Sequence, residues 1–156
     1  MTPAVKQLEM AGVTFSLAEY KHDPRTPAYG EEAARALGLS PHEVFKTLLA
    51  RLDDGRLAVA IVPVSHPLDL KALARAAGAR RAAMAEAEEA QRATGYVLGG
   101  ISPLGQKRRL LTLLDESAER LPTIHISGGR RGLEICLAPA DLMRLTDARL
   151  ATLARH

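Results

Sequence analysis

The hydrophobic residues of the chain switch several times between helical and strand spacing, and glycine or proline stands at most of the changes. Thr2-Pro3 predicts the N-cap and first residue of a short helix that ends at Gly12. Apolar and polar residues then alternate over 13–17, which predicts a strand. The segment 21–28 carries two prolines and is expected to be a loop before a second helix over 31–37.

The clearest local signal is a β-hairpin in the first half of the chain. Residues 46–52 and 57–64 are two mainly apolar runs on either side of Asp53-Asp54-Gly55-Arg56, a sequence typical of a tight turn. Just before the hairpin, Ser40-Pro41-His42-Glu43 fits a capping box with proline at the first helical position. This pattern predicts a third, very short helix.

The second half continues the mixture of helices and strands. Helices are expected from Asp69 to Gly78, over 85–94, and from near Pro139 towards the end of the chain, with a break near Thr146-Asp147. Strands are expected over 96–98, 110–114, 123–127 and 133–137. Because strands follow each other as hairpins rather than alternating regularly with helices, we expect an α+β fold. The prediction is a single domain, residues 1–156, with a central mixed, largely antiparallel, barrel-like sheet surrounded by helices.

Composition places the chain among ordinary globular proteins. Its only cysteine, Cys136, cannot form an internal disulfide, which favours a reducing compartment. The first residues lack the apolar core of a signal peptide, and the longest apolar run, 57–64, is far shorter than the ~20 residues of a membrane span. We therefore expect a soluble, cytoplasmic protein that does not enter a membrane.

Charge and aromatic content limit the ways in which nucleic acid could bind. The net charge is only +3, and aromatic residues make up 3% of the chain, with no tryptophan. A protein that stacks successive unpaired bases needs more aromatic side chains, so any RNA should be held by its backbone and its terminus. The basic clusters Lys107-Arg108-Arg109 and Arg130-Arg131 directly follow or lie within glycine-rich turns. They are either solvated surface or a rim that faces phosphate.

Two glycine-rich stretches are the most unusual features of the sequence. The stretch 99–107 (Gly-Gly-Ile-Ser-Pro-Leu-Gly-Gln-Lys) has the glycine spacing of a phosphate-binding loop, but Gln106 stands where lysine is required. It is either a tight surface turn or a backbone that approaches a ligand closely. The second stretch, 127–132, is either a hairpin connection or part of the same site.

Two polar side chains are candidates for a pocket. Lys46 shares its strand face with Leu48 and Ala50, so it is either a solvated lysine or a lysine directed into a cavity. Ser127 lies on the polar face of the strand 123–127, and the opposite, apolar face should form the core. Ser127 could therefore line a cleft.

Other catalytic arrangements find little support. No motif connects Cys136 to a histidine, so we interpret it as a packing residue rather than a nucleophile. The chain also lacks a Gly-x-Ser-x-Gly nucleophile motif. The five histidines show no metal-ligand spacing: His22, His42, His66, His125 and His156. We expect neither a metal nor a cofactor.

Several motifs resemble the YbaK/ProX group of aminoacyl-tRNA editing deacylases, and within it the Cys-tRNA(Pro) deacylases. The matching pieces occur in the family's order and cover nearly the whole chain. They are residues 1–6, His22-Asp23-Pro24, Phe45-Lys46-Thr47-Leu48-Leu49, Leu68-Asp69-Leu70-Lys71, Thr94-Gly95-Tyr96, the stretch 99–107, Ser127-Gly128-Gly129 and Arg131-Gly132-Leu133. The stretch 99–107 is the most specific of these motifs.

The resemblance implies which residues form the site. Lys46 would be the essential catalytic residue, and no metal or cofactor would be needed. The positions that match the family's substrate pocket are Tyr20, Tyr29, Thr47, Gly100, Ile101, Ser102, Ser127 and Gly128. Glu134 falls where a close relative carries aspartate, so its assignment to the pocket rests on a weaker analogy.

The resemblance also implies a reaction. The chain would be a trans-editing hydrolase that deacylates Cys-tRNA(Pro), and also Cys-tRNA(Cys), with the substrate's own thiol attacking the ester and leaving as a cyclic thioester. Lys46 would hold the terminal adenosine or phosphate, or donate a hydrogen bond to the acyl group. Backbone N–H groups of residues 100–102 would stabilise the oxyanion.

Two other functions remain open from the sequence. One keeps the fold but removes a different amino acid, as in deacylation of Ala-tRNA(Pro). The other is a non-catalytic module that binds aminoacyl-tRNA or a synthetase. The chain is short and only weakly basic, so tRNA specificity should come from a partner. The family resemblance implies that this partner is prolyl-tRNA synthetase.

Overall fold

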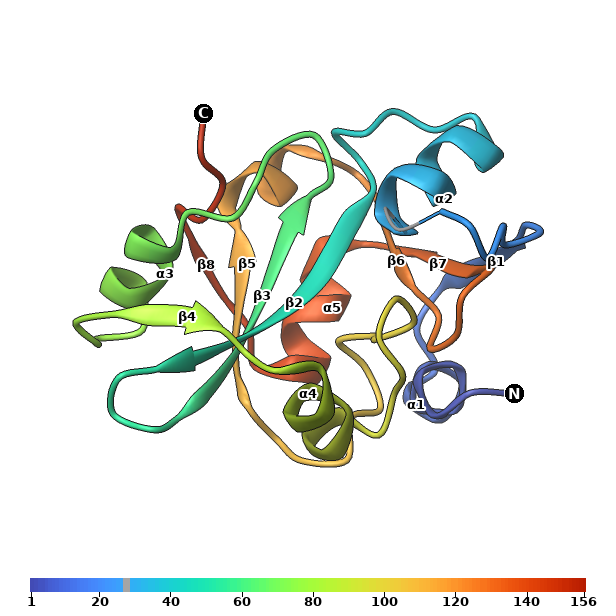
Figure 1. Cartoon of the computed structure of the whole chain (residues 1–156). Coiled ribbons are helices and arrows are strands. Elements are labelled where there is room, and N and C mark those ends of the chain that lie inside the picture. The colour runs from blue at the N-terminus through green and yellow to red at the C-terminus, as the bar shows by residue number, and fades with distance from the viewer. Residues whose placement is uncertain (27–28) are drawn as a thin grey trace.

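The computed structural model describes residues 1–26 and 29–156, and in these ranges it shows five α-helices and two β-sheets (Figure 1). The predicted mixture of helices and mainly antiparallel strands is confirmed. The barrel-like closure is wrong, because both sheets are open and end in edge strands. None of the described helices is long and apolar enough to cross a membrane.

The larger sheet has five strands in the order β4-β2-β3-β5-β8. Their bounds are β2 Phe45–Leu52, β3 Leu57–Pro63, β4 Ala82–Met84, β5 Leu111–Asp115 and β8 Arg149–Ala151. β2 and β3 form the predicted antiparallel hairpin. β5 pairs with β3, and β8 pairs with β5, both in parallel. Every residue of β3 is buried, as expected for a central strand covered on both faces.

The smaller sheet is antiparallel throughout and has the order β1-β7-β6. Its strands are β1 Phe15–Glu19, β6 Ile124–Ser127 and β7 Leu133–Leu137. A bridge between Val44 and His125 brings the start of β2 beside β6, and the His125 N–H donates to the Glu43 carbonyl at 2.9 Å. The two sheets therefore meet at one corner and diverge from it.

Helices lie around both sheets (Figure 1). Their bounds are α1 Pro3–Ala11, α2 Tyr29–Leu37, α3 Leu70–Ala76, α4 Ala87–Thr94 and α5 Pro139–Thr146, with a 3₁₀ helix over Glu116–Arg120. The predicted caps are confirmed: the Thr2 hydroxyl accepts from the Val5 N–H, and the Asp69 carboxylate accepts from two N–H groups of α3. In Figure 1, α3 lies beside the larger sheet, while α1 and α2 lie next to the smaller one.

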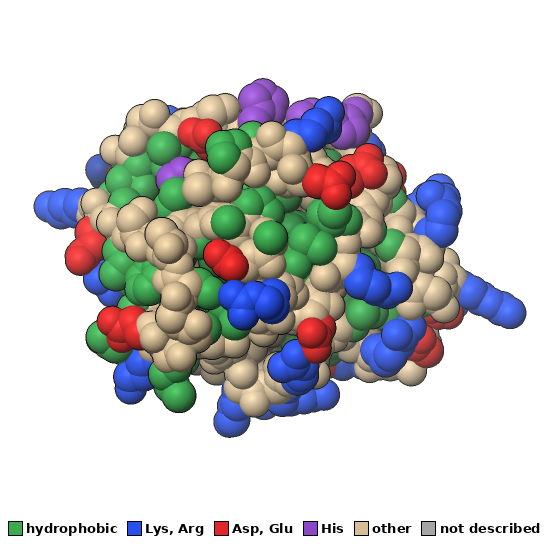
Figure 2. Space-filling model, turned by 180° about the vertical axis from the view of Figure 1, so that it is seen from behind, with side chains coloured by type: hydrophobic (Ala, Val, Ile, Leu, Met, Phe, Trp, Pro, Cys, Tyr) green, Lys and Arg blue, Asp and Glu red, His purple; other side chains and the backbone are tan. Residues whose placement is uncertain are grey.

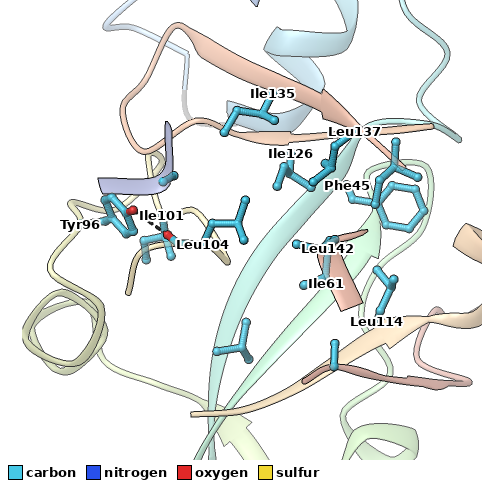
Figure 3. Packing of buried hydrophobic residues seen from close by; sticks show 14 of the residues in the cluster. Phe45, Ile61, Tyr96, Ile101, Leu104, Leu114, Ile126, Ile135, Leu137 and Leu142 are labelled. Atoms are coloured by element: carbon cyan, nitrogen blue, oxygen red, sulfur yellow. Dashed lines mark hydrogen bonds between the residues drawn. The ribbon is translucent and has the colours of Figure 1, made fainter. Parts of the chain in front are cut away.

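The main core fills the space between the two sheets (Figure 3). Its fully buried members from the two sheets and α5 include Ile61, Leu114, Ile126, Ile135 and Leu142, and α1 adds Leu8. Burial of one such side chain contributes roughly 1.5–3 kcal/mol. The corner where the two sheets meet is thus backed by tightly packed strands.

Two predicted elements are wrong in the first part and middle of the chain. Residues 41–43 form a turn rather than a helix, because Val44 is already bridged to His125 and the chain must extend at once. The capping contact itself exists, since the Glu43 carboxylate accepts from the Ser40 N–H at 3.3 Å. Residues 96–98 are not a strand: Tyr96 turns inwards after Gly95, and its hydroxyl donates to the Leu104 carbonyl at 2.6 Å (Figure 3).

Two short strands were not predicted. α5 ends at Thr146, and its C-cap Asp147 adopts the left-handed conformation (φ 57°). The chain then forms β8 instead of the predicted continuation of the helix. β4 lies in an alanine-rich stretch with no alternation to reveal a strand. Both are edge strands, so pairing with a neighbour rather than local sequence determines them.

Candidate active site

A cavity of about 410 Å³ opens at the corner where the two sheets meet. Its walls come from the start of β2, the start of α2, the glycine-rich segment after α4, and the facing ends of β6 and β7. The predicted site residues that line it are Tyr20, Tyr29, Lys46, Thr47, Ile101, Ser127 and Glu134. Its volume lies in the range of small-ligand sites.

Lys46 reaches the cavity from the second position of β2. Its strand neighbours Leu48 and Ala50 belong to one apolar cluster, in agreement with the predicted shared face. Burial lowers the pKa of Lys46, and the nearby charge of Glu31 partly opposes this shift. Within residues 1–26 and 29–156, the ammonium makes neither an ion pair nor a hydrogen bond, so it is available to a ligand.

Thr47 presents an unusual polar group. Its hydroxyl is buried and has no hydrogen-bond partner among the described residues, although Thr47 lines the cavity. Buried polar groups in proteins are nearly always paired. The unpaired hydroxyl therefore indicates a partner outside the described residues, such as a ligand or an ordered water molecule.

Glu134 and Ser127 face each other across β7 and β6, and both line the cavity. Glu134 is only 6% exposed, and its burial raises its pKa to about 8. At neutral pH this carboxyl is therefore mainly protonated and can donate a hydrogen bond. Burial, followed by the charge of Glu134, also raises the pKa of the neighbouring Tyr20 hydroxyl.

The mouth of the cavity is braced by a contact that sequence reasoning missed. The Arg131 guanidinium lies 4.4 Å from the centre of the Tyr29 ring and donates to the Leu98 carbonyl at 2.6 and 2.9 Å. A Cβ atom on Gly99 would approach both Arg131 and Tyr29 to 2.7 Å. From the sequence, Arg131 was only part of a basic rim, and nothing local indicated its aromatic partner.

Three predicted pocket residues are not among the residues that line the cavity. Gly100 fits against the backbone of Arg130, which a Cβ atom would approach to 2.9 Å. The Ser102 side chain is fully buried, and its hydroxyl accepts from the Leu104 N–H at 3.2 Å. The Gly128 N–H donates to the Leu133 carbonyl at 2.8 Å. In this structure, these three residues shape the turns that hold the lining residues.

This geometry also narrows the set of possible oxyanion donors. The Gly100 N–H already donates to the Val97 carbonyl at 3.0 Å. The N–H groups of Ile101 and Ser102 make no hydrogen bond within the described part of the chain, so they remain candidates. The expectation that residue 100 contributes a free donor is not met, because the turn uses that donor itself.

Cys136 lies outside this site. It is half-buried on β7, opposite Ser16 and His125, and does not belong to the cavity lining. Among the described residues, no group of three or more His, Cys, Asp or Glu side chains is placed to hold a metal ion. The polar groups at the cavity are thus the Lys46 ammonium, the carboxyls of Glu31 and Glu134, hydroxyls and backbone N–H groups.

Comparison with known proteins gives a consistent picture. A sequence model described as an aminoacyl-tRNA editing domain matches residues 23–145. EbsC of Enterococcus faecalis, provisionally named a Cys-tRNA(Pro)/Cys-tRNA(Cys) deacylase, is 37% identical over 150 residues, which cover 96% of this chain and 91% of EbsC.

Solved structures agree with the sequence match. One, provisionally described as a trans-editing enzyme for prolyl tRNA synthetase, superposes with a TM-score of 0.84 at 27% identity over 100% of this chain and 99% of that one. The hypothetical protein APE2540 superposes with a TM-score of 0.87 at 25% identity over 98% and 99% of the two chains. The chain therefore belongs to the aminoacyl-tRNA editing domain family.

Proposed function

We propose that this deacylase removes cysteine from proline tRNA, and also from cysteine tRNA, and that residues 1–156 act as one editing domain. The family makes the chain a hydrolase of aminoacyl-tRNA esters. The amino acid and the tRNA are inferred from EbsC, whose name specifies both and whose similarity extends over 96% of this chain. Such an enzyme is needed because a synthetase pocket cannot strongly reject a near-isosteric amino acid.

One observation carries the proposal: the cavity offers a cation without a partner but no nucleophile with a base. Lys46 has no partner among the described residues, and the residues that line the cavity include no cysteine and no histidine. Ser127 and Thr47 supply hydroxyls, and Glu31 and Glu134 supply carboxyls, but among the described residues neither hydroxyl is hydrogen-bonded to a carboxyl or an imidazole that could activate it. A nucleophile brought by the substrate fits this set of residues.

In the proposed reaction, the thiol of the bound cysteine loses its proton and attacks its own carbonyl carbon. The bond from that carbon to the ribose oxygen then breaks, and the ribose oxygen takes up a proton. Cysteine leaves as a cyclic thioester, which water opens to free cysteine. Lys46 would hold the terminal nucleotide or the acyl oxygen, and the N–H groups of Ile101 and Ser102 would stabilise the oxyanion.

We also propose that prolyl-tRNA synthetase is a partner of this chain. The similar structure described as a trans-editing enzyme for that synthetase supports this proposal. A cavity of about 410 Å³ can hold the aminoacylated end of a tRNA but no base-paired stem. Selection of the correct tRNA should therefore come in part from another protein.

The direct test is hydrolysis of proline tRNA charged separately with cysteine, alanine, serine and proline. We expect rapid loss of cysteine and little loss of proline. Faster loss of alanine than of cysteine would assign the chain to a different amino acid. Binding of all four charged forms without hydrolysis would replace the enzyme with a binding module.

A further inference from the structure

A second depression, of about 480 Å³, borders the same glycine-rich segment further along the chain. Its walls are α1, residues 103–110 and the end of α5. We call it the basic groove, because Lys6, Arg108 and Arg109 are its charged lining residues. Neither the proposed reaction nor the similarity to other proteins assigns a role to it.

The charge of the groove has one sign. Among its described lining residues there is no aspartate or glutamate. Arg109 pairs with Asp147, which lies outside the lining, whereas Lys6 and Arg108 are exposed and make no ion pair within the described residues. On the face drawn in Figure 2, basic and acidic side chains are intermingled. The groove is thus a local concentration of positive charge on a weakly charged protein.

The wall that carries these cations is fixed in place. The N–H groups of Lys107 and Arg108 donate to carbonyls at the end of α4, at 2.9 and 3.1 Å. The Gly105 N–H donates to the Gln7 side chain on α1 at 2.7 Å, and the Gln7 amide reaches the Leu145 carbonyl on α5 at 3.4 Å. An anion in the groove would therefore meet preformed walls rather than a loop that must first become ordered.

One chain segment contributes to the walls of both the cavity and the groove. Ile101 lines the cavity and Pro103 lines the groove. Because these residues are two apart in the chain, their Cα atoms are at most about 7.6 Å from each other. A polynucleotide whose last nucleotide enters the cavity must leave across this wall or along another edge of the mouth. The groove offers the polynucleotide's phosphates two cations that make no ion pair among the described residues, Lys6 and Arg108, whereas Arg131 at the mouth is already engaged by Tyr29 and Leu98.

We infer that the basic groove binds the phosphodiester backbone of the strand whose aminoacylated end enters the cavity, an inference that rests on the proposed function. Phosphate contacts position a nucleic acid without reading its sequence, and arginine and lysine supply most of them. Three aromatic residues, Tyr20, Tyr29 and Phe45, line the cavity, but none lines the groove, so binding in the groove relies on charge rather than base stacking.

The test is the double variant Lys6→Glu/Arg108→Glu. Its matched control is Lys71→Glu/Arg75→Glu, which makes the same change in net charge on the exposed side of α3, away from α1 (Figure 1). Binding of uncharged proline tRNA is followed by fluorescence anisotropy over a range of salt concentrations. Hydrolysis is measured for Cys-tRNA(Pro) and for cysteine esterified to adenosine.

We expect the groove variant to bind tRNA at least tenfold more weakly. The fall of log affinity with log salt concentration should also become less steep, by about 1.5 units, as the loss of two phosphate contacts predicts. Its kcat/KM should fall at least tenfold for Cys-tRNA(Pro) but less than twofold for the adenosine ester. The α3 variant should match the wild type in all of these measurements.

Equal tRNA binding by the groove variant and the α3 variant would overturn the inference. So would loss of binding to prolyl-tRNA synthetase with tRNA affinity unchanged, because the groove would then hold an acidic protein surface. Failure of the proposed function is a separate result, in which the wild type hydrolyses neither ester. The anisotropy measurement on uncharged tRNA would still decide whether the groove binds RNA.

Discussion

At the residue scale, the cavity brings together two ionisable side chains whose pKa values are shifted by burial. Burial lowers the pKa of Lys46 and raises that of Glu134, so both shifts favour the neutral form. The two side chains do not form an ion pair with each other. Each is therefore free to interact with a substrate, and each can be tested by a substitution that changes charge but little else.

Lys46→Ala should abolish deacylation of Cys-tRNA(Pro) while the protein stays folded. The ammonium is the one cation of the cavity lining in the described part of the chain, and we expect its loss to slow single-turnover hydrolysis at least 100-fold, about 2.7 kcal/mol of barrier. Lys46→Met keeps the aliphatic stem and should be equally inactive. Lys71→Ala, on the exposed side of α3, is the control. Turnover like that of the wild type in Lys46→Met would remove Lys46 from the site.

Glu134 should make the folded protein less stable as the pH rises. Its pKa is about 8 in the folded protein and 4.5 in its ordinary state, so between these values the folded form binds more protons than the unfolded form. The free energy of unfolding should then fall by up to about 1.4 kcal/mol per pH unit in that window. Glu134→Gln should remove this fall.

The measurement is urea unfolding at pH 5, 6, 7 and 8. The free energy of unfolding of Glu134→Gln, relative to that of the wild type, should increase with each rise in pH. Glu88→Gln, at an exposed position of α4, should give a curve parallel to that of the wild type. A pH-independent difference at position 134 would mean that the buried carboxyl is already charged at pH 5.

At the element scale, local sequence determined the helices and the central hairpin, whereas long-range pairing determined the rest. The caps at Thr2 and Asp69 and the β2–β3 turn have strong local signals, and all were predicted. The short strands β4 and β8 exist only because a neighbouring strand offers hydrogen-bonding groups. Conversely, Ser40-Pro41-His42-Glu43 has a local helix signal that the bridge at Val44 overrides.

The same distinction applies to the site. The alternation of apolar and polar residues along β2 and β6 correctly predicted that Lys46 could enter a pocket and that Ser127 could line a cleft. The resemblance to editing deacylases added Tyr20, Tyr29 and Glu134, which no local pattern had indicated. The brace of Arg131 on Tyr29 joins segments about 100 residues apart, so no pattern within either segment could reveal it.

Gly105→Ala should destabilise the protein much more than Gly38→Ala, although both glycines are left-handed, with φ of 65° and 67°. At Gly38 the new methyl would meet nothing within 4 Å, so only the backbone cost of about 1–2 kcal/mol applies. At Gly105 it would lie 2.5 Å from the Pro3 carbonyl carbon. This clash adds roughly 1–3 kcal/mol and should push the glycine-rich segment away from α1.

Urea unfolding of both variants measures the difference. We expect Gly105→Ala to lose at least 1 kcal/mol more than Gly38→Ala, and also to lose affinity for tRNA, because Gly105 anchors the wall of the basic groove. Equal destabilisation would show that the segment can move away from α1 without cost, and the argument for a preformed groove would then fail.

At the scale of the whole molecule, the protein can contact only a small part of a tRNA. It has 156 residues and a net charge of +3, and its cavity holds little more than an aminoacylated nucleotide. If the basic groove binds the adjoining strand, that contact reads phosphates, which are the same in every tRNA. The isolated chain should therefore be selective for the amino acid and nearly indifferent to the tRNA body.

The final prediction combines these two selectivities. On one tRNA, cysteine should be removed at least 100-fold faster than serine under single-turnover saturation, although the two side chains differ by one atom. A thiol near pKa 8.5 is partly ionised at neutral pH and strongly nucleophilic, whereas a serine hydroxyl needs a general base, and the described cavity lining holds no histidine. Exclusion by size would give the opposite order, because a cavity that admits cysteine also admits the smaller serine.

With cysteine held constant, proline tRNA and cysteine tRNA should be deacylated with kcat/KM values within about tenfold of each other. Addition of prolyl-tRNA synthetase should then raise the value for proline tRNA alone, since the synthetase recognises the parts of the tRNA that this chain cannot reach. Equal rates for cysteine and serine at saturation would replace the substrate thiol with water as the nucleophile. A strong preference for proline tRNA without the synthetase would mean that the protein itself reads bases near the end of the acceptor strand.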